Sequence, residues 1–427
     1  MEKLVKKAEE LGAETAEVFF SEDSGFSFST EKRRVSSKEF SSEEGFGVRV
    51  FKKHRLGFAH CQRKKDFERA VKLALSFSKF SPEIKEFSFA GKSGVGKAPS
   101  FDARVESLAA EDGVNMVKEL LKGVLENAEP TECELSFARG RVRILNSNGV
   151  ELEETRTEVS CYATAESGGT SAGYGAGDSM LEFDPFQVGL EAGELAKKSA
   201  GAKPFPSGET TVVFDARALN SFISELLLPS FDGENARRGI SVLCGKKGEQ
   251  IASEEFSLAD EPLARGPNSS AFDDEGVASK KKELVGNGVF RHFLFDLKTA
   301  AMAPELEPEA GNCSRSSYDS SPSIGCSNLV IGRGSCRDVL GEIGSGLLVS
   351  SFFGGHTANK VTGDFSVSVD LGFEIKEGMP GKAVRGMVIS GNAFTMLENI
   401  IAIEREQESF FDLRAPKIAF SKVSVSS

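Results

Sequence analysis

A two-residue alternation of apolar and polar side chains runs through residues 17–60, and it restricts the fold more than any other pattern in the chain. It appears in four successive segments, Glu17–Phe20, Gly25–Thr30, Arg34–Phe40 and Gly45–Phe51. Because neighbouring side chains of a strand point to opposite faces, these segments predict strands with one buried and one hydrated face, as in an antiparallel sheet. The polar residues 52–55 predict a turn before a returning strand at 56–60.

Three other stretches have the apolar spacing of a helix, with apolar side chains three or four residues apart. They are residues 1–12, 66–80 and 112–126. Further strands are predicted at 134–139, 142–146 and 150–166, with a break at Gly140 and a hairpin turn at Asn148-Gly149. Residues 1–202 are therefore predicted to form an N-terminal α/β domain with an antiparallel sheet.

A linker with proline and glycine at 202–209 separates this part from a C-terminal domain predicted at 210–427. A buried type of strand at 210–214 and a helix at 216–228 open that domain. Short strands separated by Gly, Asn and Asp follow, at Val289–Phe295, Asn328–Gly332, Gly346–Phe353, Phe365–Leu371, Val384–Ser390 and Lys417–Val425. This spacing predicts a large curved antiparallel sheet or open barrel with a few helices, so the fold class is α+β.

The charge of the chain excludes some kinds of partner. It has 52 basic and 64 acidic residues, a formal net charge of −12, whereas binding to nucleic acid requires a basic surface. No run approaches the roughly 18 apolar residues of a membrane span, and the charged N-terminus does not resemble a secretory signal. Seven scattered cysteines form no CxxC pair, which favours free thiols. We therefore expect a cytoplasmic protein that binds neither nucleic acid nor membrane.

The glycine-rich run at 168–177 includes the string Gly169-Thr170-Ser171-Ala172-Gly173, which has the GxSxG form of a hydrolase nucleophile. A phosphate loop would continue with Lys and then Ser or Thr, and a nucleophile elbow would open directly into a helix. Neither feature follows this run. It is interpreted as a mobile hairpin end.

Candidate metal ligands are few. The chain contains four histidines, at positions 54, 60, 292 and 356, and no two have the spacing that places zinc ligands on one face of a helix. His356 lies in a loop and is interpreted as a surface residue. The acidic triplet Asp273-Asp274-Glu275 could bind a cation, but consecutive side chains diverge, so a solvated turn is predicted.

Several motifs occur in an order that resembles one family. The main ones are Ala271–Gly276 (AFDDEG), Leu284–Val289 (LVGNGV), Asp296–Ala300 (DLKTA), Val361–Ser366 (VTGDFS) and Ser390–Asn392 (SGN). Glu44–Val50, Gly57–Ala59, Ser327–Leu329 and Ala415–Ile418 continue the series. Together they resemble the motifs of the TldD/PmbA family, and the similarity extends over essentially the whole chain.

The resemblance carries an implication about zinc. The TldD branch of the family has a helix with HExxxH, whose histidines bind zinc and whose Glu is the general base, and a later cysteine completes the site. The corresponding positions here are Ser224, Glu225 and Pro229, and residues 407–415 contain no cysteine. The chain is thus similar to the TldE (PmbA)-like branch. That similarity implies no catalytic residue, no metal ligand and no cofactor in this chain, with zinc only in a TldD-like partner.

The same resemblance implies a non-catalytic subunit of a heterodimeric metallopeptidase complex that degrades or processes unfolded peptides. The expected partners are a TldD-like metallopeptidase subunit and unfolded peptides, which would dock by strand addition. Residues expected to line a peptide groove or cavity are His356, Thr362, Gly363, Asp364, Phe365, Ser366 and Asn392.

Two alternatives stay open at this point. The chain could be a stand-alone hydrolase whose metal site combines His356 with Asp364 or Asp274. It could also be a peptide-binding regulatory module that forms a homodimer in isolation.

Overall fold

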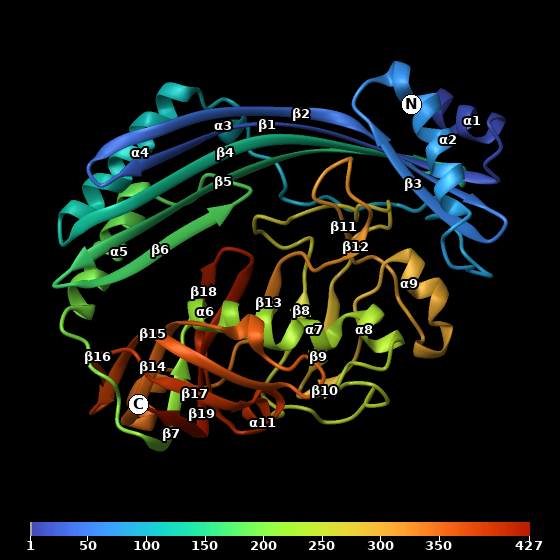
Figure 1. The fold of residues 1–427 in the computed structure, drawn as a ribbon. Coiled ribbons are helices and arrows are strands. Elements are labelled where there is room, and N and C mark those ends of the chain that lie inside the picture. The colour runs from blue at the N-terminus through green and yellow to red at the C-terminus, as the bar shows by residue number, and fades with distance from the viewer. Residues whose placement is uncertain (1) are drawn as a thin grey trace.

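The computed structural model describes residues 2–427, which fold around two large sheets (Figure 1). The first sheet is six-stranded and antiparallel, in the order β3-β2-β1-β4-β5-β6. Its strands are β1 (Thr15–Glu31), β2 (Arg34–Lys52), β3 (Arg55–Cys61), β4 (Glu129–Asn146), β5 (Glu151–Ser167) and β6 (Thr170–Asp178). The antiparallel sheet predicted from the alternating pattern is confirmed, and it forms an arch over the rest of the chain (Figure 1).

Three strands of the arch are longer than the sequence pattern predicts, and one of them, β2, joins the strands predicted at 34–40 and 45–51. β1 passes through Gly25 and joins two predicted strands, and β4 passes through Gly140, where a break is predicted. The glycine in β1 is required by a close approach, because a Cβ on Gly25 would lie 2.8 Å from the Phe137 carbonyl oxygen on β4. Glycine in a strand interior here marks a neighbour that comes close and not the end of a strand.

The glycine-rich run is also more regular than predicted. Only Gly168 and Gly169 form a turn, with φ of +60° and +76°, and the remaining residues belong to β6. The prediction of a mobile hairpin end is therefore wrong for most of this run. Small side chains there leave room for Phe411 from the second half of the chain, whose ring would lie 2.8 Å from a Cβ on Gly177.

Helices cover only the convex face of the arch. α4 (Ala110–Leu125) and α5 (Pro185–Ser199) pack on one another and on β4, β5 and β6, while α1 (Glu2–Glu10) and α2 (Phe67–Ser78) cover the end formed by β1 to β3. The short α3 (Ala103–Glu106) and η1 (Lys64–Asp66) complete this half. The concave face packs against the loop at 84–98 and against the second half of the chain.

The second half contains a five-stranded barrel. Its strands are β7 (Gly208–Phe214), β14 (Ser345–Phe353), β15 (Asp364–Lys376), β17 (Val388–Asn392) and β19 (Leu413–Ser426). The barrel closes because β19 pairs with both β17 and β7. Two pairings in this sheet, β14 with β7 and β13 with β19, are parallel. The predicted curved sheet or barrel is thus confirmed, with a mixed and not purely antiparallel register.

Shorter elements extend the barrel. The strands are β8 (Leu258–Asp260), β9 (Lys282–Gly286), β10 (Val289–Phe290), β11 (Cys313–Ser314), β12 (Ser323–Ile324), β13 (Leu329–Ile331), β16 (Met379–Val384) and β18 (Ile400–Phe410). The helices are α6 (Ala216–Ser221), η2 (Phe222–Leu227), α7 (Leu228–Phe231), α8 (Gly233–Arg237), α9 (Leu297–Met302), η3 (Pro304–Leu306), α10 (Val339–Ile343), η4 (Gly355–Thr357) and α11 (Ala393–Glu398). Phenylalanines from several of these elements fill the core, with Phe214 and Phe420 rings 5.2 Å apart.

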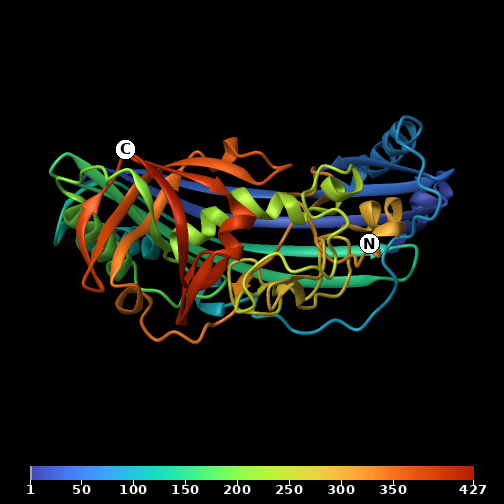
Figure 2. The ribbon, with the colours of Figure 1, turned by 90° about the horizontal axis from the view of Figure 1, so that it is seen from below.

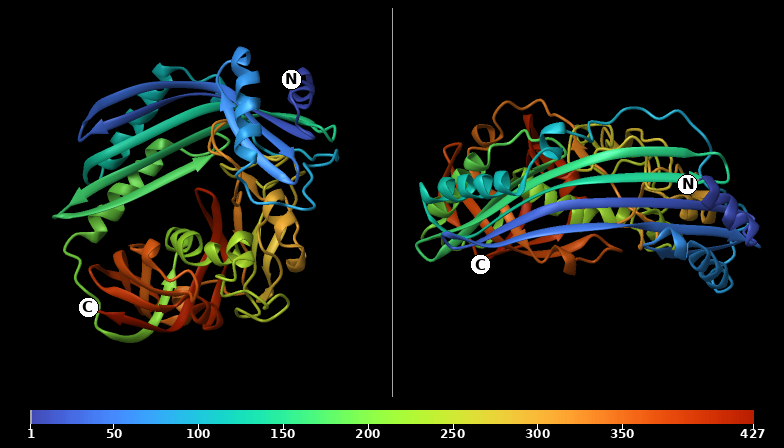
Figure 3. Two further views of the ribbon diagram at one scale, coloured as in Figure 1. Left: turned by 45° about the vertical axis from the view of Figure 1, so that its right-hand side comes forward. Right: turned by 90° about the horizontal axis from the view of Figure 1, so that it is seen from above.

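The long strands of the arch cross the barrel and its loops along their whole length (Figure 2). The β18–β19 hairpin rises from the barrel toward β6 (Figure 3). There the ring centroids of Phe410 and Tyr174 are 6.3 Å apart. Loops between residues 270 and 320 touch the other end of the arch. Within residues 2–427, no helix has the length and apolar character needed to cross a membrane. The domain limits predicted at 202 and 210 stay a prediction.

Candidate functional site

The residues predicted to line a groove gather at one rim of the barrel. Asp364 at the start of β15 pairs with Asn392 at the end of β17. The Asn392 amide donates to the Thr362 carbonyl at 2.7 Å and to Asp364 Oδ1 at 2.9 Å, and its oxygen accepts from the first N–H groups of α11. Hydrogen bonds from Thr362 and Asn392 lower the pKa of Asp364. Gly363, at φ +84°, makes the tight turn between Thr362 and Asp364.

The remaining predicted residues extend this rim. His356 is exposed in η4, and Ser366 is exposed two residues into β15, whereas Phe365 points into the core. Gly355 lies directly against Glu225, because a Cβ on Gly355 would be 2.3 Å from Glu225 Oε2. The structure therefore brings the predicted groove residues other than Phe365 onto one face, beside the helix that carries Glu225.

That helix is distorted at the motif itself. It runs from α6 through η2 to α7, and η2 is a π-helical turn at Phe222–Leu227. Pro229 has no N–H to donate to the carbonyl of Glu225 four residues earlier, and its ring crowds that carbonyl. A π-turn relieves the crowding by widening the helix. Proline at this position thus changes the course of the backbone at Glu225.

The side chains of this helix do not fit a zinc ion. Zinc sites in peptidases use three protein ligands, His, Cys or a carboxylate, at about 2.0–2.3 Å. Here Ser224 is exposed, Glu225 is half-buried and Phe222, Leu226 and Leu227 are packed into the core. Within residues 2–427, no three His, Cys, Asp or Glu side chains are grouped so that they could hold a metal ion. The alternative site built on His356 has no such group either, and the expected lack of a metal stays a prediction.

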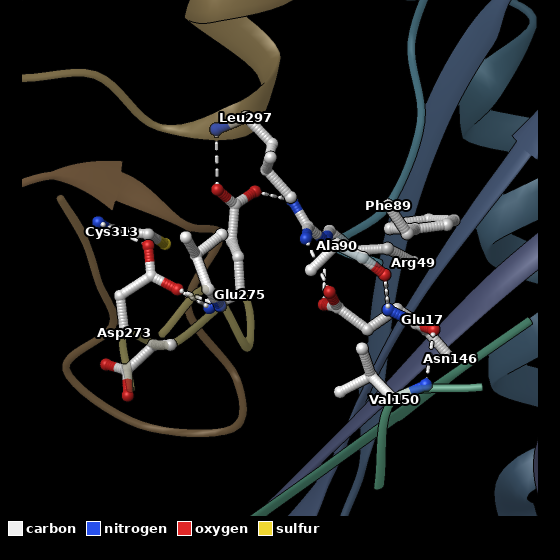
Figure 4. A network of polar contacts seen from close by, with 12 residues as sticks. Glu17, Arg49, Phe89, Ala90, Asn146, Val150, Asp273, Glu275, Leu297 and Cys313 are labelled. Carbon is white, nitrogen blue, oxygen red and sulfur yellow. Dashed lines mark hydrogen bonds and ion pairs between the residues drawn. The ribbon is translucent and has the colours of Figure 1, made fainter. Parts of the chain in front are cut away.

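Buried charges lie instead between the arch and the loops below it (Figure 4). Arg49 on β2 donates to both oxygens of Glu17 on β1, at 2.7 and 2.9 Å, and also to Glu275. Arg315 donates to Glu17 from the opposite side. The side chains of Arg49 and Arg315 are 5% and 0% exposed, and those of the two glutamates are fully buried. We call these four residues the ion-pair cluster.

Each carboxylate of the ion-pair cluster is fully partnered. Burial opposes the ionisation of Glu17, but the charges of Arg49 and Arg315 outweigh it and lower its pKa. Burial raises the pKa of Glu275, although Arg49 and the Leu297 N–H at 2.6 Å act against it. The cluster joins β1 and β2 to two loops more than 200 residues away in the sequence.

The acidic triplet is not a solvated turn, and that prediction is wrong. Asp273, Asp274 and Glu275 are 9%, 8% and 0% exposed. Asp273 accepts from the N–H groups of Glu275, Val277 and Cys313 at 2.9–3.1 Å, although burial and the charge of Glu275 raise its pKa. Arginines that stand far away in the sequence reach the triplet, so no local pattern could reveal its burial.

The serine-rich loop at 314–323 docks onto the arch. Tyr318 is 3% exposed and lies over Gly45 on β2, where a Cβ would come within 2.4 Å of its ring. The Tyr318 N–H donates to Ser21 Oγ at 3.2 Å. The sequence signal for this contact is the pair Gly45 and Gly47 within an otherwise strand-forming segment, since glycine there leaves space for another chain segment.

A lysine is buried beside this contact region. Lys282 is 3% exposed and donates to Asn312 Oδ1 and to the Glu309 carbonyl. Burial lowers its pKa to about 8. Asp260 accepts from the Asn312 amide at 2.7 Å and from Ser327. All of these groups are engaged with one another, so we assign them to holding the loops together.

A polar cavity of about 470 Å³ lies between the concave face of the arch and these loops. β1, β4 and β5 form its roof, and the loops at 260–274 and 311–327 form its floor. Its volume is within the range of small-molecule and peptide pockets, roughly 300–1,000 Å³. None of the rim residues predicted from sequence lines it.

Comparisons with known proteins agree with this architecture. Three models of the PmbA/TldA metallopeptidase match the chain, domain 1 at residues 16–77, the central domain at 103–200 and the C-terminal domain at 207–427. An uncharacterised protein of Methanocaldococcus jannaschii is 32% identical over 425 residues, 98% of each chain. A metalloprotease PmbA homolog of Haemophilus influenzae is 25% identical, over 99% of this chain and 94% of its own. The crystal structure of TldE from Thermococcus kodakarensis superposes with a TM-score of 0.89 at 25% identity, covering 100% of both chains.

Proposed function

Because this chain belongs to the PmbA/TldA metallopeptidase family and is TldE-like, we propose that it is the zinc-less, non-catalytic subunit of a TldD/TldE-type metallopeptidase complex. In this complex a TldD-like partner holds the zinc and cleaves unfolded peptides. The present chain supplies part of the wall that encloses the peptide.

One observation carries the proposal. The helix at the position of the family's zinc motif has Ser224 and Pro229 in place of two ligands, and Pro229 widens the helix at Glu225. A carboxylate without a bound zinc has no water of lowered pKa to activate, so Glu225 cannot serve as the general base of that mechanism. A serine and a proline do not replace the missing donors.

The barrel rim supports a role in contact. Asp364, Ser366, Asn392 and His356 form a polar edge beside the exposed side chains of Phe353 and Val361. Mixed apolar and polar surfaces of this kind are typical of interfaces between proteins. We therefore assign the rim to the contact with the TldD-like subunit or with the peptide that it cleaves.

The proposal also places the complex in the cytoplasm. All seven cysteines of the chain are free, which fits a reducing compartment.

The test is a cleavage assay on three samples: this chain alone, a TldD-like chain from the same source alone, and an equimolar mixture. We expect cleavage of an unfolded fluorogenic peptide in the mixture, with zinc bound only by the partner. A bulky Ser366→Trp change at the rim should lower cleavage by the mixture about tenfold, an effect equal to about 1.4 kcal/mol. Its matched control is Ser345→Trp, at an exposed position on the opposite end of the barrel.

Cleavage by this chain alone, or an unchanged rate after its addition to the partner, would refute the proposal. Equal losses with Ser366→Trp and Ser345→Trp would refute the assignment of the rim and leave the subunit role intact.

A further inference from the structure

Two cavities lie in line along the underside of the arch. The first, of about 470 Å³, extends on β1 from Phe19 to Asp23. The second, of about 530 Å³, covers Ser27 to Ser29 on the same strand and is closed below by Phe411 of the β18–β19 hairpin. Only Gly25 separates them among the inward-facing positions of β1. We call the space formed by both cavities the underside groove.

The roof of the underside groove consists of small side chains in rows across the strands. The central row contains Ser27, Ser136, Ser160 and Gly177, which are paired successively across β1, β4, β5 and β6. The next row begins with Gly25 and Ala138. Small side chains leave room for an extended chain to lie flat against the strands, parallel to them.

Each of four successive rows of this roof contains at least one acidic side chain, and the row of Asp23 also contains Glu43 and Arg156. Asp23 lies in the first row, Glu158 in the row of Gly25, Glu39 in the row of Ser27 and Glu134 in the row of Ser29. Rows of one face are two residues apart along a strand, about 6.6–6.8 Å. Side chains on one face of an extended peptide have the same spacing.

Three carboxylates of the groove form no ion pair, although the charge of Arg156 acts on Asp23 from the same row. Across residues 2–427, no hydrogen bond or ion pair reaches the carboxylates of Asp23, Glu158 or Glu134. Burial raises the pKa of Asp23 and of Glu158. The two arginines that line the first cavity pair with other carboxylates, Arg156 with Glu154 at 2.9 Å and Arg315 with Glu17, although Nη1 of Arg315 has no hydrogen-bond partner among the described residues.

We propose that the underside groove binds an extended polypeptide segment and selects lysine or arginine at alternate positions. Each basic side chain meets one row of the roof and neutralises its carboxylate. The inference rests on the proposed function for the polypeptide nature of the ligand, and it adds the substrate class and a binding site within this chain. Charge complementarity favours a basic peptide over a neutral or an acidic one.

The test measures binding to the full-length lone chain and involves no cleavage, so its failure is distinguishable from failure of the proposed function. The probes are three dye-labelled ten-residue peptides with Ser or Ala at every second position and Lys, Gln or Glu at the others. Fluorescence anisotropy should show the lysine peptide bound at least about tenfold more tightly than the glutamine peptide, with weaker binding at higher salt.

Variants then locate the site. Asp23→Asn with Glu158→Gln should weaken binding of the lysine peptide about tenfold or more. The matched control is Glu44→Gln with Glu191→Gln, which removes the same charge from exposed positions on β2 and α5 outside the groove. This control should leave the affinity within about twofold. Ser136→Phe should block the central row and weaken binding of all three peptides.

Equal binding of the three peptides would overturn the proposal, as would an equal loss of affinity in the groove variant and its control. Binding of spermidine without binding of the lysine peptide would assign the acidic rows to a free polyamine and would also overturn it. Thermal unfolding of each variant establishes that the protein is folded during the measurement.

Discussion

The ion-pair cluster and the helix at 216–231 use ionisable residues in opposite ways. Glu17, Arg49 and Glu275 are almost fully buried and satisfy one another. The helix packs its apolar side chains into the barrel core and leaves Glu225 half-buried at the rim without a cationic partner among the described residues. The resemblance assigns the zinc motif of the TldD branch to this helix. The buried charges of this chain lie instead between the arch and the loops below it. The difference indicates that the buried charges hold two parts of the chain together.

Removal of Arg49, the cation at the centre of the ion-pair cluster, should lower the stability of the protein the most. Arg49→Met leaves Glu17 and Glu275 buried without their shared partner, and breaking a buried pair costs about 3–5 kcal/mol. We expect a correspondingly lower denaturation midpoint in urea, followed by circular dichroism. Arg33→Met, which breaks the exposed pair with Glu129, should leave the midpoint close to that of the parent protein, because water screens exposed ion pairs. Similar midpoints for the two variants would show that the cluster is no more important than a surface pair.

In the helix at 216–231, only substitutions on the apolar face should lower the stability of the protein. Leu227→Ala creates a cavity in the barrel core and should cost about 2–5 kcal/mol. Glu225→Gln should change stability by less than about 0.5 kcal/mol, as is usual for substitutions that are not in the core. Thermal unfolding of both variants is sufficient. A larger effect of Glu225→Gln than of Leu227→Ala would reverse the roles assigned here to the two faces of this helix.

Disturbing the contact between the serine-rich loop and the arch should lower the stability of the protein by a smaller amount. Gly45→Ala places a Cβ within 2.4 Å of the Tyr318 ring, and overpacking of this kind costs about 1–3 kcal/mol. Gly91→Ala is the control, because a Cβ there meets no atom within 4 Å. If both variants unfold at the same temperature as the parent protein, the loop is not held against the arch in solution.

The pH dependence distinguishes the cluster further. The pKa of Glu17 is lowered in the folded chain, so its contribution is complete above the unfolded pKa, about 4.3, and is lost as the pH falls through the folded value. Glu17→Gln should therefore lose less stability between pH 5 and pH 3 than the parent protein, to a degree measurable by urea unfolding at each pH. Glu44→Gln, at an exposed position, should keep the parent slope. Parallel curves for the parent and Glu17→Gln would contradict the role of this ion pair.

Much of the fold was predictable because local pattern determines it. The alternation in residues 17–60 predicts the antiparallel arch, and the helices on its convex face follow from their apolar spacing. The continuous passage of β1 through Gly25 was not predictable, because the reason for this glycine is the position of Phe137 on another strand. Barrel closure by β19 is likewise a pairing of residues that are about 200 positions apart.

The candidate site was predictable in part. The motif at 361–366 and Asn392 do lie together. The start of β15 pairs with the end of β17, and polar turn residues stand at that end of both strands. The burial of Asp273 to Glu275 was missed because their partners, Arg49 and Arg315, have no fixed spacing from them in the sequence. The rows of acidic residues under the arch were missed for a related reason, since they depend on the register of four strands.

We propose that this chain forms part of the cavity wall and holds no metal of its own, and native mass spectrometry with added zinc tests this proposal. The full-length chain is incubated with a small excess of zinc, exchanged into volatile buffer and weighed beside a TldD-like chain treated in the same way. The account predicts no stoichiometric zinc on this chain and one zinc on the partner, with Glu225→Gln giving the same spectrum as the parent protein. One zinc per molecule of this chain, lost in Glu225→Gln or His356→Ala, would contradict the account.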